Sequence, residues 1–130
     1  MTNPFKDQET FMTACDQQVN THSVSQYNMY LNLIDEEHTE LKEAIQANDQ
    51  IEQLDALIDI LVVTIGAIHS AGFDGEGAWK EVMRTNFAKI DPTTGKVRKR
   101  EDGKVLKPEG WTAPELEHFL KCYNKNSSAI

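Results

Sequence analysis

Residues 33–65 hold two groups of acidic side chains at helical spacing. The first group is Glu36, Glu37 and Glu40, in the pattern E-E-x-x-E, and the second is Glu52, Asp55 and Asp59. At 100° per residue, each group falls on one side of its helix. Oxygen ligands gathered in this way are the ligands that hard divalent cations such as Mg²⁺ and Mn²⁺ prefer.

Apolar residues surround the second group on nearly every side. They are Leu54, Leu57, Ile58, Ile60, Leu61, Val62, Val63 and Ile65. A helix that is apolar almost all round is usually buried, and a buried carboxylate costs several kcal/mol unless its charge is cancelled. The short polar turn at residues 46–50 predicts an antiparallel pair that brings both groups together. We therefore predict a divalent-metal site between the two helices.

Three other interpretations fit parts of this pattern. Acids at helical spacing commonly form a solvated face, above all for Glu36–Glu40 taken alone, and an acidic interaction protein would turn them toward water. A nucleotide-binding module without hydrolytic activity is a second alternative. A di-iron carboxylate bundle needs two E-x-x-H motifs, and only residues 115–118 supply one.

The rest of the chain predicts an all-α fold, an antiparallel bundle of four to five helices completed by oligomerisation. Helices are expected at about 4–18, 26–47, 49–71, 77–89 and 112–123. Their expected signals include N-caps at Asn3, Ser25 and Asp49, a stop at Gly72, and a capping box beginning at Thr112. Residues 96–106 predict a short hairpin around an Asp-Gly turn, or an ordered loop. We expect one domain over 1–123 and a flexible tail at 124–130.

Charge divides the chain into an acidic and a basic segment. The net charge of −8 disfavours nucleic-acid binding. Residues 35–59 contain nine acids and one base, whereas residues 80–107 contain nine bases and four acids. A metal–phosphate site would need both kinds of segment. The apolar run at 54–71 is interrupted by two acids and is too polar for a membrane span, and no secretory signal is evident, so we expect a cytoplasmic protein.

These motifs together resemble a known enzyme family. The E-E-x-x-E motif, the second acidic helix, the segment E-V-M-R-T-N-F-A-K at 81–89 and the segment R-E-D-G-K-V-L-K at 100–107 are similar to the all-α nucleoside triphosphate pyrophosphohydrolases, the MazG-like and phosphoribosyl-ATP pyrophosphohydrolase-like group. The resemblance covers residues 5–116. It implies Mg²⁺- or Mn²⁺-dependent hydrolysis of a nucleoside triphosphate to the monophosphate and pyrophosphate, by a homodimer or homotetramer.

The resemblance also implies roles for the acids. Glu37 and Glu40 match metal ligands, and Glu36 matches the residue that orients the attacking water. Asp59 matches the aspartate of the second motif, E-x-x-D, but Ala56 stands three residues before it. We predict Asp55 as the partner of Asp59 and keep Glu52 as the alternative. The number of metal ions stays open.

The basic segment is expected to bind the substrate. By resemblance, Arg84, Asn86 and Lys89 contact phosphate or sugar. Arg100, Lys104 and Lys107 are candidates for the triphosphate tail, in the site of the same or a neighbouring subunit. The alternative for both sets is a solvated basic surface. The sequence does not identify the base.

Overall fold

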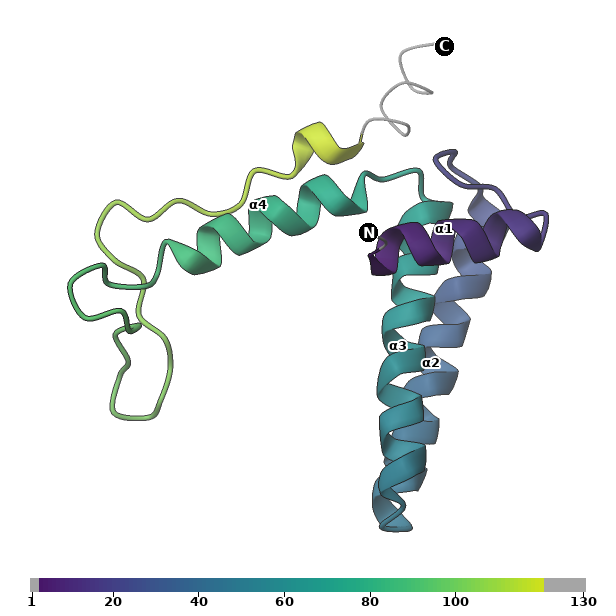
Figure 1. Cartoon of the computed structure of the whole chain (residues 1–130), viewed down its shortest axis with the longest axis horizontal. Helices are drawn as coiled ribbons and strands as arrows, with labels where there is room; N and C mark the ends of the chain where they lie inside the picture. The colour runs from purple at the N-terminus through teal and green to yellow at the C-terminus, as the bar shows by residue number, and fades with distance from the viewer. Residues whose placement is uncertain (1–2, 121–130) are drawn as a thin grey trace. The chain divides into compact units, whose positions relative to one another are not determined.

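The part of the protein that the structure describes folds as a set of helices without a sheet (Figure 1). The computed structural model describes residues 3–120. Its elements are α1 (Pro4–Ala14), α2 (Val24–Gln46), α3 (Gln50–Ser70), α4 (Gly75–Phe87) and a 3₁₀ helix, η1 (Glu117–Leu120). Over residues 3–120 the only β-type pairings are the isolated bridges Ile90–Val97 and Lys99–Val105. The predicted all-α class is confirmed, and the 96–106 region is an ordered loop rather than a hairpin of two strands.

The chain forms two compact units. The first unit contains α1, α2 and α3 and extends to Gly75, and the second spans Glu76–Phe119 and contains nearly all of α4. In the first unit α2 and α3 pack along their length as an antiparallel pair, and α1 lies across the end opposite the α2–α3 turn (Figure 1). The predicted tail at 124–130 lies outside the described residues.

Three predicted helix boundaries are confirmed by their capping contacts. The side chain of Asn3 accepts a hydrogen bond of 2.9 Å from the backbone N–H of Lys6, and Asp49 accepts one of 3.1 Å from Glu52. Each contact satisfies a donor of the first helical turn that has no partner within the helix. Gly72 has a φ of 79°, the left-handed conformation that commonly follows a helix end.

Two other boundaries differ from the prediction. The first helix ends at Ala14 rather than Gln18, because Asp16 adopts a left-handed φ of 59° and reverses the chain. The second helix begins at Val24 rather than 26, and its N-cap is Ser23, not Ser25. Helix α4, predicted at 77–89, begins and ends two residues earlier, at Gly75 and Phe87.

The predicted capping box at Thr112 is wrong. The backbone N–H of Glu115, which a capping box would direct to the side chain of Thr112, instead donates a 2.8 Å hydrogen bond to a carboxylate oxygen of Glu81 on α4. No helix begins at residues 112–116. Only the short η1 follows, and Tyr123, the predicted end of the last helix, lies beyond the described part of the chain.

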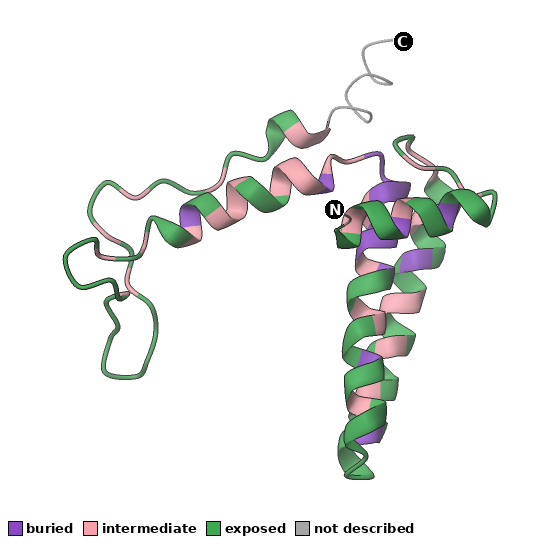
Figure 2. Cartoon of the chain, viewed as in Figure 1, coloured by how far each residue is buried: buried purple, intermediate pink, exposed green. Residues whose placement is uncertain are grey.

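The core of the first unit lies where α1 meets α2 and α3. Met12, Tyr30, Val63 and Ala67 form a buried cluster there. In Figure 2 the buried segments concentrate at this end of the helix pair, and exposed segments dominate toward the α2–α3 turn. Within the first unit, the core therefore stabilises one end of the hairpin and leaves the other end little covered.

Gly66 permits the close contact between α2 and α3. A Cβ atom at this position would lie 2.6 Å from Cδ1 and 2.7 Å from Cζ of Tyr30. The ring cannot move aside freely, because its hydroxyl donates a hydrogen bond to Gln17 and the residue is only 5% exposed.

We expect Gly66→Ala to lower the free energy of unfolding by about 1–3 kcal/mol through overpacking, although Ala is the better helix former. Urea unfolding measures the change. In the double variant Gly66→Ala/Tyr30→Ala the loss should be smaller than the sum of the two single losses, because the small side chain removes the clash. Strictly additive losses in the double variant would show that the two residues are not in conflict.

The apolar surroundings of the second acidic group are only partly buried in the first unit. Val63 and Ile65 are buried, whereas Leu54, Leu57 and Leu61 on α3 are 62%, 49% and 58% exposed. The predicted burial of α3 is therefore confirmed for some of these residues and wrong for the others, because α2 covers only one side of the helix. Phe11 on α1 is likewise 61% exposed.

Candidate functional site

The α2–α3 hairpin sets the acids opposite one another. Glu37 and Asp59 are each eleven residues from Asn48 in the turn, and Glu40 and Ala56 are each eight residues from it. An antiparallel pair places such equidistant positions side by side. Asp55 precedes Ala56, so it lies near Glu40, whereas Glu52 is opposite Ala44, one turn nearer the hairpin end.

The four inner acids form one electrostatic cluster, which we call the carboxylate cluster: Glu37, Glu40, Asp55 and Asp59. Burial, a hydrogen bond to Glu40 and the charges of Glu40, Asp59 and Asp55 raise the pKa of Glu37 to about 7. Burial and the carboxylates of Asp55 and Glu40 raise the pKa of Asp59 as well. Mutual repulsion and lost hydration are the causes that the sequence predicted.

Exposure differs among the acids. Glu37 and Asp59 are half-buried, whereas Glu36, Glu40 and Asp55 are exposed. Among residues 3–120, one carboxylate oxygen of Glu37, Oε2, is buried without a hydrogen-bond partner. An acceptor oxygen in that position loses hydration and gains nothing in return, which is unfavourable unless a proton or a cation fills the place.

A divalent cation fits the chemistry of the carboxylate cluster. All of its donor atoms are oxygens, and one of them is buried without a hydrogen-bond partner among the described residues. Burial and the neighbouring carboxylates both raise the pKa values of Glu37 and Asp59, and a cation would offset both effects. Within residues 3–120, however, no three His, Cys, Asp or Glu side chains are already arranged closely enough to hold an ion. Side-chain rotation would have to complete the coordination shell.

The raised pKa of Glu37 predicts how stability depends on pH. Between its ordinary pKa of 4.5 and about 7, folded Glu37 binds more protons than unfolded Glu37 does. The metal-free protein should therefore lose stability as the pH rises through this window, and the loss should be complete above about pH 7.

Glu37→Gln, which cannot ionise, should accordingly raise the melting temperature by a few degrees at pH 8 and change it little near pH 4.5. Thermal unfolding in chelator across this range measures the difference. Equal stabilisation at both pH values would mean that ionisation of Glu37 is not the cause.

The predicted substrate residues all lie in the second unit, and intramolecular contacts engage several of them. The guanidinium of Arg84 donates to both carboxylate oxygens of Glu81 at 2.7 and 3.0 Å. This pairing, with the N–H of Glu115, lowers the pKa of Glu81 to about 2. Arg100 is paired in the same bidentate way with Asp102. Both arginines therefore hold local structure and do not present a free charge.

The lysines are arranged differently. Lys89 Nζ donates a 3.1 Å hydrogen bond to the side-chain oxygen of Asn86, as their i,i+3 spacing allows. Lys89 and Lys107 both contact the ring of Trp111, while Lys104 is exposed in the loop. Sequence reasoning missed Trp111 and Glu81. The i,i+3 spacing of Glu81 and Arg84 could have shown their pairing.

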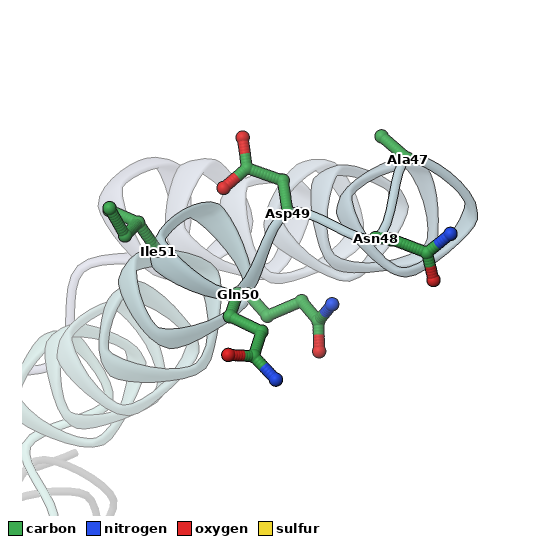
Figure 3. Close-up of a pocket in the computed structure, with 6 residues that line it drawn as sticks. Ala47, Asn48, Asp49, Gln50 and Ile51 are labelled. Atoms are coloured by element: carbon green, nitrogen blue, oxygen red, sulfur yellow. The ribbon is translucent and has the colours of Figure 1, made fainter.

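A pocket of about 590 Å³ lies at the α2–α3 turn (Figure 3). Its lining residues are Ala47, Asn48, Asp49, Gln50, Ile51 and Gln53. The only ionisable side chain in that set is Asp49, whose carboxylate caps α3. The pocket is therefore separate from the carboxylate cluster and lacks the paired acids that hydrolysis would need.

Over residues 3–120, no single helix is both long enough and apolar enough to cross a membrane. Helices α3 and α4, taken together as one bent pair, reach the required length and composition.

Comparison with known proteins identifies the family. The phosphoribosyl-ATP pyrophosphohydrolase family model matches residues 8–86, which include α2, α3, most of α1 and nearly all of α4. No curated protein matches the chain significantly. The match covers more than half of the chain and contains the whole carboxylate cluster. The protein belongs to the phosphoribosyl-ATP pyrophosphohydrolase family of the all-α NTP pyrophosphohydrolase superfamily, and it is a hydrolase that acts on a phosphoanhydride bond of a nucleotide-like substrate.

Proposed function

We propose that this protein is a Mg²⁺-dependent nucleoside triphosphate pyrophosphohydrolase, with Mn²⁺ as a substitute ion. The observation that carries the proposal is the carboxylate cluster, in which burial and the neighbouring carboxylates raise the pKa of Glu37 to about 7. Its Oε2 is buried there without a hydrogen-bond partner among the described residues. An acidic surface that served only to bind a basic protein would have no reason to turn carboxylates toward one another.

The cluster residues have distinct proposed roles. Glu37 and Glu40 from α2, with Asp55 and Asp59 from α3, would hold the cation. When bound, Mg²⁺ neutralises phosphate charge and makes water more acidic. Glu36 is exposed beside the cluster, where it would orient the attacking water and accept its proton. The water oxygen bonds to the α-phosphorus, the bond from that phosphorus to the bridging oxygen breaks, and pyrophosphate leaves.

The second unit would supply the positive groups for the substrate. Lys89 and Lys107 are the strongest candidates, because neither ammonium is paired with a carboxylate of the described residues. Asn86 would act with Lys89, and Lys104 is exposed in the basic loop. Arg84 and Arg100 would have to exchange their present carboxylate partners for phosphate, so we assign them a weaker role.

A second copy of the chain would complete the site. The exposed apolar residues of α3 occupy an arc of about 140° on its wheel, and Asp55 and Asp59 lie at the border between this arc and the side facing α2. Covering each Leu or Ile contributes about 1.5–3 kcal/mol. A homodimer, alone or as half of a homotetramer, would bury this face and shelter the carboxylate cluster from water.

A panel of ribo- and deoxynucleoside triphosphates, with Mg²⁺ or Mn²⁺, tests the proposal. The expected result is metal-dependent release of pyrophosphate, not orthophosphate, from at least one substrate. Binding of nucleotide with metal but without product would instead support the non-hydrolytic nucleotide-binding alternative. Neither product nor metal-dependent thermal stabilisation would support the acidic interaction protein.

A further inference from the structure

Trp111 gathers two lysine side chains at the surface of the second unit. The Nζ atom of Lys89 lies 5.2 Å from the ring centroid, and that of Lys107 lies 4.7 Å from it. Both distances are within the range of about 6 Å at which an ammonium is attracted to an aromatic ring. Because both nitrogens are measured from the same centroid, they are at most about 10 Å apart.

The indole ring is itself fixed to the end of α4. Its Nε1–H donates a 2.7 Å hydrogen bond to the backbone carbonyl of Thr85. Helix α4 ends at Phe87, so this carbonyl belongs to the last turn, whose carbonyls lack partners within the helix. A few residues on, the N–H of Glu115 donates to Glu81, which ties the same segment to α4 a second time.

Both ammonium groups remain available to an anion. In the described part of the chain neither forms an ion pair, and the hydrogen bond from Lys89 goes to the neutral amide of Asn86. The C-terminal end of a helix also favours nearby positive charge. Two like charges at this separation repel each other, and a bound anion would remove that repulsion.

We propose that Trp111 is a positioning residue that holds Lys89 and Lys107 as one binding site for a polyphosphate chain. This inference rests on the proposed function and adds a residue to it. An anion with several charges along its length, such as a triphosphate tail or pyrophosphate, can contact both ammonium groups at once. A single carboxylate offers one charge and would gain from only one of them.

Calorimetric titration of the metal-free full chain with inorganic tripolyphosphate tests the site directly. We expect saturable binding, with Kd at least tenfold higher in Lys89→Met and in Lys107→Met. Lys96→Met removes an exposed lysine of the same unit and should change Kd less than twofold. Equal weakening by all three variants, or no binding at all, would overturn the proposal.

Variants of Trp111 separate positioning from folding. Trp111→Leu should weaken tripolyphosphate binding as much as the lysine variants do, and Trp111→Phe, which keeps an aromatic face, should restore part of it. In a Trp79→Phe background Trp111 is the only tryptophan, and its fluorescence should change on titration. Circular dichroism checks folding, and the lysine variants decide the proposal if Trp111→Leu unfolds.

Kinetics then distinguish this inference from the proposed function. In nucleotide hydrolysis Trp111→Leu should raise KM about tenfold and change kcat less than threefold, as lost ground-state binding does. Unchanged KM in an active enzyme would refute the role of Trp111 while hydrolysis stands. If no variant hydrolyses any nucleotide, the proposed function fails, and the tripolyphosphate titration still decides whether the anion site exists.

Discussion

Asp59→Asn should lower the rate of pyrophosphate release by about 100-fold or more, because losing a ligand removes several kcal/mol of stabilisation of the transferring phosphate. Glu40→Gln should have an effect of similar size. Asp59 lies on α3 and Glu40 on α2, close enough for their charges to interact, and both carboxylates help to raise the pKa of Glu37. Pyrophosphate release at saturating nucleotide and Mg²⁺ measures the loss.

Asp35→Asn is the matched control. It also removes one acid from α2, but Asp35 is exposed and lies about 160° from Glu37 on the helical wheel. Its rate should stay within twofold of the unmodified enzyme. Glu52→Gln tests the alternative ligand. Suppose that Asp59→Asn keeps the full rate while Glu52→Gln loses most of it. The metal site would then lie one helical turn nearer the hairpin end, which would contradict our assignment.

The second large effect is expected from charges placed on the apolar face of α3. Leu57→Glu with Leu61→Glu should convert the proposed oligomer into monomers and reduce pyrophosphate release at least tenfold. Both leucines are about half exposed within one chain, so they contribute little to folding of the monomer. In a dimer they would be covered, and a buried unpaired carboxylate costs several kcal/mol. Light scattering coupled to size exclusion measures the mass.

Val24→Glu serves as the control for this experiment. Val24 is 62% exposed at the start of α2, away from the turn-side half of α3. It should leave both mass and activity unchanged. A fully active monomer after the double substitution on α3 would show that a partner copy is not needed to complete the site.

Local signals in the sequence predicted the helices well. Asn3, Asp49 and Gly72 act through contacts within a few residues, so their type alone indicated where helices begin or end. The predicted N-cap of α2, Ser25, is wrong, because the cap is Ser23, a residue of the same type two positions earlier. The choice between them depends on a distant contact, in which the N–H of Ser23 donates to the carbonyl of Ser70.

The carboxylate cluster was predictable because helical periodicity and a short turn fix the register. Glu37 and Asp59 follow from their equal distance to Asn48, without knowledge of any other contact. The exposure of the apolar face was not predictable in the same way, since hydropathy does not say which surface covers it. The contacts of Trp111 also depend on how a loop folds back onto α4, which no period in the sequence encodes.

A crystal structure of the protein grown with Mn²⁺ tests the central claim most directly, because anomalous scattering locates the ion. The account predicts a Mn²⁺ peak bound by carboxylate oxygens of both α2 and α3, among Glu37, Glu40, Asp55 and Asp59, with Glu37 Oε2 at or beside the ion. A structure in which Mn²⁺ is absent from these residues, and their side chains point into solvent, would contradict it.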